Sequence, residues 1–162
     1  MNEKMIQVTQ GDMERLTALL ASRLKLWTRD QEHLEMLARE LDRAEIVRSK
    51  DIPADTVTMD SHVLVRDLDT GGEFTCILVF PSEADIAKGK ISILAPIATA
   101  LLGYREGDEI ESPAPGGRRR LNVVRVLYQP EAARDESGHS VAMWRDLQMQ
   151  RGKVEQSQLQ VV

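Results

Sequence analysis

The segment ISILAPIATALLG, residues 91–103, constrains the fold of this chain more than any other part of its sequence. A strand-like run leads directly into Pro96, which suits the first position of a helix because its missing N–H needs no partner there. Gly103 suits the position after the last helical turn because glycine adopts a positive φ without a Cβ clash. The segment therefore predicts a strand followed by one short helix, which lays on a sheet an apolar face made of Ile97, Ala98, Leu101 and Leu102.

Alternating and β-branched stretches on both sides of this helix predict a small sheet. Turn-forming residues separate these stretches at residues 69–72, 106–108 and 115–117. Strands joined by such short connections pair mostly antiparallel, so we expect an antiparallel sheet that is covered on one face by the short helix. The predicted strands are residues 62–67, 74–80, 90–94, 108–111 and 121–128.

Two runs of apolar residues with spacings of three and four precede the sheet and predict two helices that pack along a seam. Between the runs, Thr28 and Gln31 have the spacing of a capping box, so residues 26–28 are expected to form the turn between antiparallel helices. Isolated helices of about 15 residues are marginal in water, so the seam needs support from the sheet domain or from another protein. The seam residues are Leu16, Leu20 and Leu24 in the first run and Leu34, Leu37 and Leu41 in the second.

These elements divide the chain into four parts and place it in the α+β class. Pro53 ends the second helix and marks a linker. Beyond the sheet the composition becomes polar, and Val141, Trp144 and Leu147 predict at most one brief helix in a loosely held tail. The predicted parts are a short antiparallel coiled-coil hairpin over residues 9–48, a linker over 49–56, a sheet domain over 57–130 and the tail over 131–162.

The charge of the chain argues against direct binding to nucleic acid. Its 21 Lys and Arg residues are outnumbered by 26 Asp and Glu residues, and no segment carries the basic footprint that phosphate contacts need. The basic run at residues 118–120 is interpreted as a solvated strand start. No stretch approaches the roughly 18 apolar residues of a membrane span, and the amino terminus lacks the apolar core of a signal peptide. We therefore expect a cytoplasmic protein without sequence-specific nucleic-acid binding and without a membrane partner.

Sequence motifs for catalysis and for ligand binding are absent from the chain. It has neither G-x-x-x-x-G-K-[ST] nor G-x-G-x-x-G, the glycine-rich loops that cradle nucleotide phosphates. Its single cysteine, Cys76, excludes an internal disulfide and is interpreted as a small buried apolar residue. His33, His62 and His139 lie in different segments without the spacing of metal ligands. The sequence therefore predicts no cofactor, no metal site, no catalytic residues, no small-molecule substrate and no enzymatic activity.

Several separate stretches of the chain resemble known proteins. Residues 91–103, the following GDEIESPAPGG and the long strand that ends in VLYQP resemble the carboxy-terminal domain of the Gre transcript-cleavage factors. The resemblance to a related family, the regulators of nucleoside diphosphate kinase (Rnk), is closer still. It is carried by LDRAEIV at residues 41–47, DTVTMDS at residues 55–61 and VLYQPEA at residues 126–132. The resemblance implies an FKBP-like fold for the sheet domain and RNA polymerase as a partner, bound at the rim of its secondary channel.

The same resemblance implies a polymerase-docking segment at the start of the short helix. Gre factors place an acidic-Ser-Pro step there, which helps to grip a pair of polymerase helices. In this chain the acid and the hydroxyl are lost, and an apolar edge takes their place. Leu94 has core packing as an alternative role. The predicted docking residues are Leu94, Ala95, Pro96 and Ile97, and aspartate at both Pro96 and Ile97 is expected to abolish binding without unfolding the domain.

The tip of the helical hairpin departs from the Gre pattern. Gre factors carry D-x-x-E-N at the end of a long coiled coil, where the two acids help to hold a catalytic Mg²⁺. Here Asp30 and Glu32 are two residues apart and no Asn follows, and side chains with this spacing on a helix point in different directions. Acidic residues in a first helical turn are also favoured by the helix dipole. The predicted tip residues are Trp27, Thr28, Arg29 and Asp30, of which Trp27 either packs into the hairpin or meets a partner.

Two classes of function remain. The preferred function is a non-catalytic RNA polymerase-binding transcription regulator that docks at the secondary channel, competes with Gre-type factors and affects nucleoside diphosphate kinase levels. The alternative is an enzyme-like role, either a transcript-cleavage-stimulating elongation factor or, less favoured, a prolyl isomerase. Isomerase sites of the FKBP-like fold are lined by aromatic residues, whereas the chain has only two Phe, two Tyr and two Trp.

Overall fold

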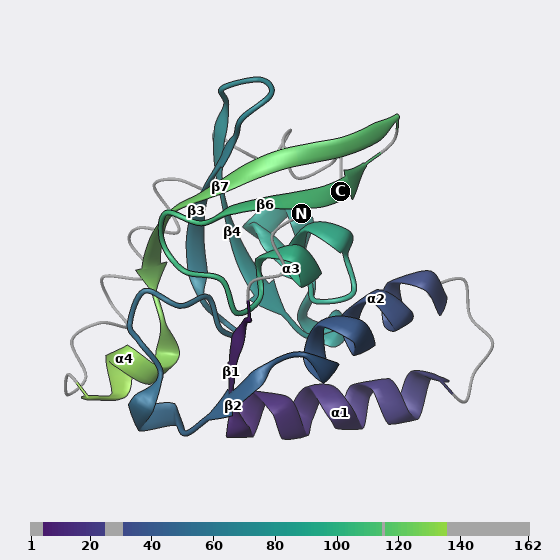
Figure 1. Cartoon of the computed structure of the whole chain (residues 1–162), viewed down its shortest axis with the longest axis vertical. Coiled ribbons are helices and arrows are strands. Elements are labelled where there is room, and N and C mark those ends of the chain that lie inside the picture. The colour runs from purple at the N-terminus through teal and green to yellow at the C-terminus, as the bar shows by residue number, and fades with distance from the viewer. Residues whose placement is uncertain (1–4, 25–30, 115, 136–162) are drawn as a thin grey trace.

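A pair of helices lies beside a curled five-stranded sheet in the computed structural model of the protein, which describes residues 5–24, 31–114 and 116–135 (Figure 1). This mixed arrangement confirms the predicted α+β class. The predicted turn at residues 26–28, with the tip residues Trp27, Thr28, Arg29 and Asp30, lies outside the described residues, as does the predicted helix around Trp144.

The helices α1, Gln10–Leu24, and α2, Gln31–Asp42, form the predicted hairpin. α1 begins before its first apolar residue because Thr9 caps it: the Thr9 Oγ1 accepts a hydrogen bond of 3.1 Å from the N–H of Asp12. The apolar seam is confirmed as well. Its buried members on the two helices are Leu16, Leu20, Leu34, Leu37 and Leu41.

A two-stranded parallel ribbon ties the two ends of the hairpin together. It consists of β1, Gln7–Thr9, and β2, Glu45–Val47, and the N–H of Glu45 also donates to the carbonyl oxygen of Ile6 at 2.8 Å. Sequence reasoning missed this ribbon because strands of three residues have no detectable period, and it extended the hairpin to residue 48. The boundaries of the four predicted parts stay a prediction.

The main sheet has the strand order β5-β4-β3-β7-β6. All five strands lie within a few residues of their predicted positions. Two shifts of register between β3 and β7 interrupt their ladder, as β-bulges do, and bulges bend strands. β6 and β7 form the hairpin predicted around Gly116 and Gly117, whose φ angles are 83° and 145°. The strand bounds are β3 His62–Asp67, β4 Glu73–Val79, β5 Lys90–Ser92, β6 Glu109–Ala114 and β7 Gly117–Tyr128.

One strand pair corrects the expectation of a wholly antiparallel sheet, because β4 and β5 pair parallel. The chain between them makes two short 3₁₀ turns, Pro81–Glu83 and Ile86–Lys88. Gly89 follows with a φ of 74°, and its carbonyl oxygen accepts from the N–H of Ile77 at 2.8 Å. This compact loop brings the chain back to Ile77 before β5 begins, so β5 runs in the same direction as β4 beside its last three residues.

The short helix α3, Pro96–Leu101, lies between the sheet and the helical hairpin (Figure 1). Pro96 begins it and Gly103 follows it with a φ of 84°, as the sequence predicted. Its buried apolar side chains belong to the same cluster as the seam leucines and the sheet residues Val63, Val65 and Phe74. The hairpin and the sheet therefore share one core, which supplies the support that an isolated hairpin lacks.

One further feature agrees with the sequence analysis. Cys76 is fully buried, and burial raises the pKa of its thiol to about 12, so it behaves as a small apolar residue. After β7 the described part of the chain forms one short helix, α4, Pro130–Asp135, which the sequence analysis did not predict. None of the helices in the described part of the chain has the length and apolar character needed to cross a bilayer.

Candidate functional site

A side-chain turn fixes the backbone that leads into α3. The Oγ of Ser92 accepts a hydrogen bond of 3.1 Å from the N–H of Leu94, and the carbonyl oxygen of Ser92 accepts one of 2.9 Å from the N–H of Ala95. One turn into the helix, the hydroxyl of Thr99 donates to the carbonyl oxygen of Ile93 at 2.6 Å. These bonds hold the segment in one conformation before any partner arrives.

The four predicted docking residues divide into two buried and two half-buried ones. Leu94 is 6% exposed and Ile97 is 1% exposed, and both belong to the apolar core. Ala95 and Pro96 are half-buried and reach the surface. The surface of this segment is therefore the Ala95-Pro96 step alone. The expectation that aspartate at Ile97 would leave the fold intact does not hold, because that carboxylate would lie inside the core.

Beside Pro96 lies an open hollow of about 430 Å³. The helical hairpin and the β6–β7 hairpin project toward the same side of the molecule, and α3 lies between them (Figure 1). Both parts of the fold contribute to the walls of the hollow. Pro96 comes from α3 and Pro113 from β6, and α2 contributes Glu32, His33, Glu35, Met36 and Arg39.

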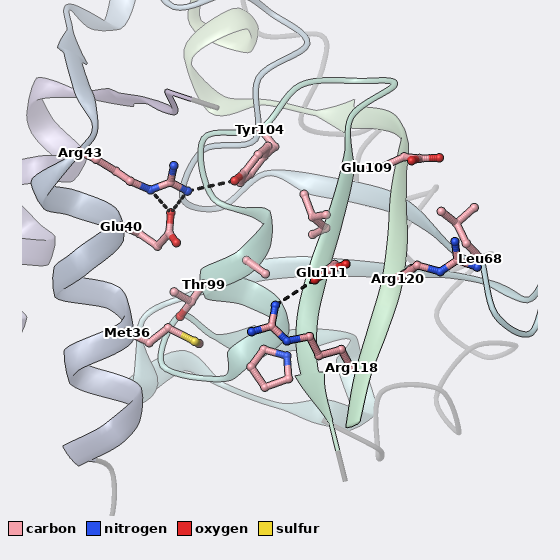
Figure 2. A pocket seen from close by; sticks show the side chains of 13 residues that line it. Met36, Glu40, Arg43, Leu68, Thr99, Tyr104, Glu109, Glu111, Arg118 and Arg120 are labelled. Atoms are coloured by element: carbon pink, nitrogen blue, oxygen red, sulfur yellow. Dashed lines mark hydrogen bonds and ion pairs between the residues drawn. The ribbon is translucent and has the colours of Figure 1, made fainter. Parts of the chain in front are cut away.

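A second hollow of about 260 Å³ adjoins the first, and Met36 and Pro113 line both. Figure 2 shows two ion pairs among the charged side chains that line it, Glu40 with Arg43 and Glu111 with Arg118. Arg43, the residue after α2, lies 2.6 Å from Glu40 and donates to the hydroxyl of Tyr104, three residues after α3, at 3.1 Å. Arg118 pairs with Glu111 at 2.9 Å across β6 and β7. This second hollow is thus bordered by contacts that hold the hairpin against the sheet domain.

The stretches that carry the family resemblance meet at the start of α1. The carboxylate of Asp12 accepts a hydrogen bond of 3.1 Å from the N–H of Met59, within the 55–61 stretch. The Thr58 hydroxyl lies 2.7 Å from a carboxylate oxygen of Glu131 and 2.8 Å from the hydroxyl of Ser61. These stretches therefore hold α1 and α4 against the sheet, so the resembling stretches have a structural role.

Asp12 lies in a place that is unfavourable for a charge. It is 6% exposed, and burial raises the pKa of its carboxyl to about 6, a shift opposed by the Met59 hydrogen bond and assisted by the charge of Glu131. Arg15 is the nearest cation, at 3.9 Å, and Asp60 adds a further negative charge. At neutral pH the folded protein therefore holds a buried carboxylate with little compensation.

Asp12→Asn is expected to stabilise the protein at pH 7.5. The pKa of Asp12 is about 6 in the folded chain and near 3.8 in the unfolded chain. The contribution of this carboxyl to the free energy of unfolding is therefore fully present below pH 3.8, and it is lost as the pH rises through about 6. The wild type should be more stable at pH 5 than at pH 7.5 by on the order of 1–2 kcal/mol from this group. Asparagine keeps an acceptor for the Met59 N–H and has no charge, so the variant should lose most of that difference. Urea unfolding at both pH values measures it, and an unchanged pH difference in the variant would rule this explanation out.

In the described part of the chain, no group of three or more His, Cys, Asp or Glu side chains is placed to hold a metal ion. The residues that sequence reasoning missed are those of α2 that share a hollow with Pro96. Glu32, Met36 and Arg39 recur at spacings of four and three, which places them on one face of the helix. That spacing was visible in the sequence, but no sequence pattern indicated that this face of α2 lies beside α3.

Two family models match adjoining regions of the chain. The model described as Rnk N-terminus matches residues 4–47, and the model described as the C-terminal region of the transcription elongation factors GreA and GreB matches residues 52–128. The chain is 41% identical over 102 residues to the regulator of nucleoside diphosphate kinase of Escherichia coli strain K12, which covers 62% of this chain and 75% of that protein. The chain belongs to the Rnk family.

Relatives of this Rnk-family protein include elongation factors. Transcription elongation factor GreA of Hyphomonas neptunium is 39% identical over 103 residues, covering 61% of this chain and 66% of that protein. A solved structure of the prokaryotic transcription elongation factor GreA/GreB from Nitrosomonas europaea matches with a TM-score of 0.63 and 42% identity, covering 78% of this chain and all of that one. The resemblance found in the sequence is confirmed. The hollow beside Pro96 lies where the two matched regions of the Rnk-family chain meet, with α2 in the first and α3 in the second.

Proposed function

We propose that this Rnk-family protein is a transcription regulator that binds RNA polymerase at the rim of the secondary channel. In this proposal it competes there with Gre-type factors, does not itself catalyse RNA cleavage, and affects nucleoside diphosphate kinase levels. The observation that carries the proposal is the surface position of the Ala95-Pro96 step, inside the region that matches the GreA/GreB model. The names of the relatives, a regulator and elongation factors, support it.

The chemistry of the step supports docking by an apolar contact. Ala95 offers a methyl group and Pro96 a ring, and the backbone around them is already held by Ser92 and Thr99. A segment that is ordered before binding loses little conformational entropy on docking. The step also has no charge of its own, so any electrostatic selection of the partner has to come from neighbouring elements.

The cleavage alternative is less well supported. Glu32 lies in the first turn of α2 and is exposed, on the wall of the hollow beside Pro96. Asp30 lies outside the described residues. A helix of 15 residues such as α1 reaches only about 22 Å, which is short for delivering carboxylates deep into a channel.

The isomerase alternative needs an aromatic pocket. Tyr104 is the only Phe, Tyr or Trp among the described residues that line either hollow, and its hydroxyl is bound by Arg43. The FKBP-like character of the sheet domain stays a prediction, and a fold alone does not assign an activity.

Binding of the full-length protein to core RNA polymerase tests the proposal directly. We expect the wild type to be captured by core polymerase and to be displaced by a Gre factor. Ala95→Lys should weaken capture roughly tenfold or more, because an apolar anchor at the centre of a contact carries a large share of its free energy. Ala84→Lys, an exposed position after the first 3₁₀ turn, is the matched control and should bind as the wild type does.

Two results would contradict the proposal. One is a wild type that does not bind core polymerase. The other is stimulation of RNA cleavage in backtracked elongation complexes that depends on Asp30 and Glu32, since that would make the protein a cleavage factor.

A further inference from the structure

The face of α2 that borders the hollow carries charges without ion-pair partners in the described part of the chain. Glu32, Glu35 and Arg39 are exposed there, and the only bond to one of these carboxylates among the described residues is a 3.4 Å contact from the Gln31 amide to Glu35. In the adjoining hollow, Glu40 pairs with Arg43 at 2.6 Å and the Glu111 carboxylate with Arg118 at 2.9 Å, whereas Glu109 is exposed.

These charges flank an apolar centre in a fixed order along the helix. Glu32 and Glu35 lie toward the start of α2, and Met36 follows, half-buried beside Pro96 and Pro113. Arg39 closes the row, seven residues or about 10 Å from Glu32 at 1.5 Å of rise per residue. A partner segment that lies along α2 therefore contacts two acids, then the apolar side chain of Met36, then a base.

The position of this row is fixed by the rest of the fold. The opposite face of α2 is buried through Leu34, Leu37 and Leu41. The Arg43 bond to Tyr104 joins the end of α2 to the sheet domain. The helix dipole favours an acid in the first turn of α2, where Glu32 lies. Glu35 lies beyond that turn, so the dipole does not account for its presence.

We propose that this face of α2 completes the docking surface that starts at Ala95-Pro96, and that it receives a helical segment of RNA polymerase. An apolar side chain of that segment sits against Met36, Pro96 and Pro113, and an Arg or Lys about one turn away pairs with Glu32 and Glu35. The inference rests on the proposed function and adds to it the chemistry of the partner segment. Charges at the edge of an interface select the partner and set its register, which the uncharged Ala95-Pro96 step cannot do.

The double variant Glu32→Gln and Glu35→Gln tests the inference in the full-length protein. Glutamine keeps the size and helix propensity of glutamate, so the fold should be unchanged by circular dichroism. We expect its Kd for core polymerase to be about 3- to 10-fold higher than that of the wild type at low salt, the range for exposed ion pairs. Raising the salt concentration should weaken the wild type more than the variant.

The matched control is Glu14→Gln with Glu45→Gln, which removes the same charge from exposed positions on α1 and β2 that do not line the hollow. The control should bind as the wild type does, and an equal loss in the control would overturn the inference by showing an effect of net charge alone. Unchanged binding of the Glu32 and Glu35 variant, together with loss in Ala95→Lys, would overturn the inference and leave the proposed function standing. A wild type that does not bind would overturn both.

Discussion

Gly103→Ala is expected to be among the most destabilising single substitutions in the protein, although it adds one methyl group. Gly103 has a φ of +84°, and a Cβ built there would lie 2.5 Å from the Cβ of Ile6 and 3.1 Å from the carbonyl oxygen of Gln7. Ile6 is fully buried, so it has no free space into which to move. Backbone strain and overpacking together should cost roughly 3–5 kcal/mol of the free energy of unfolding.

Urea unfolding measures this loss, and Gly107→Ala separates its two causes. Gly107 has a similar φ of +90°, but no atom lies within 4 Å of the position its Cβ would occupy. The control should therefore lose only the strain contribution, on the order of 1 kcal/mol. Equal losses at the two positions would show that the close approach of Ile6 to Gly103 is unimportant.

Ile97→Asp is expected to leave the chain unfolded. The side chain of Ile97 is 1% exposed and lies in the core that the hairpin and the sheet share. An uncompensated carboxylate there should cost about 4 kcal/mol or more, a large part of the stability of a domain of this size. Ile97→Val keeps the apolar character and should cost only about 1 kcal/mol.

Circular dichroism and thermal unfolding of both variants measure the effect, with Ala95→Lys as a reference for the exposed half of the same segment. A folded Ile97→Asp protein with a native-like melting temperature would show that Ile97 faces solvent. Ile97 would then again be a candidate docking residue. Loss of polymerase binding in Ile97→Asp, by contrast, says nothing about docking, because the variant has no fold to dock with.

Much of the fold could be predicted because its signals are local. Pro96 and Gly103 mark the ends of α3 through the backbone preferences of single residues. The leucine seam and the alternating strands depend on periods that a short window reveals. The parallel pairs β1–β2 and β4–β5 were missed because pairing between distant residues, such as Gln7 with Glu45, leaves no local pattern.

The candidate site was predictable to a smaller extent. The sequence identified the segment at Leu94–Ile97, but only the three-dimensional packing separates the buried Leu94 and Ile97 from the surface step between them. Glu32 and Glu35 carried no signal of their own, since acids on an exposed helix face are common. Their proposed role in docking depends on the position of α2 beside Pro96. That position is set by the core that the hairpin and the sheet share.

The main-chain bonds at the base of the hairpin have a consequence for synthesis on the ribosome. The N–H of Gln7 donates to the carbonyl oxygen of Gly103 at 3.4 Å, and the N–H of Gly103 donates to that of Val57 at 2.9 Å. Both helices of the hairpin therefore leave the ribosome long before the residue that closes their base has been made. Until then their leucines have no complete core, so the nascent hairpin exposes apolar surface while the segment between Asp42 and Gly103 is being made. The base of the hairpin can therefore close only after Gly103 has left the ribosome.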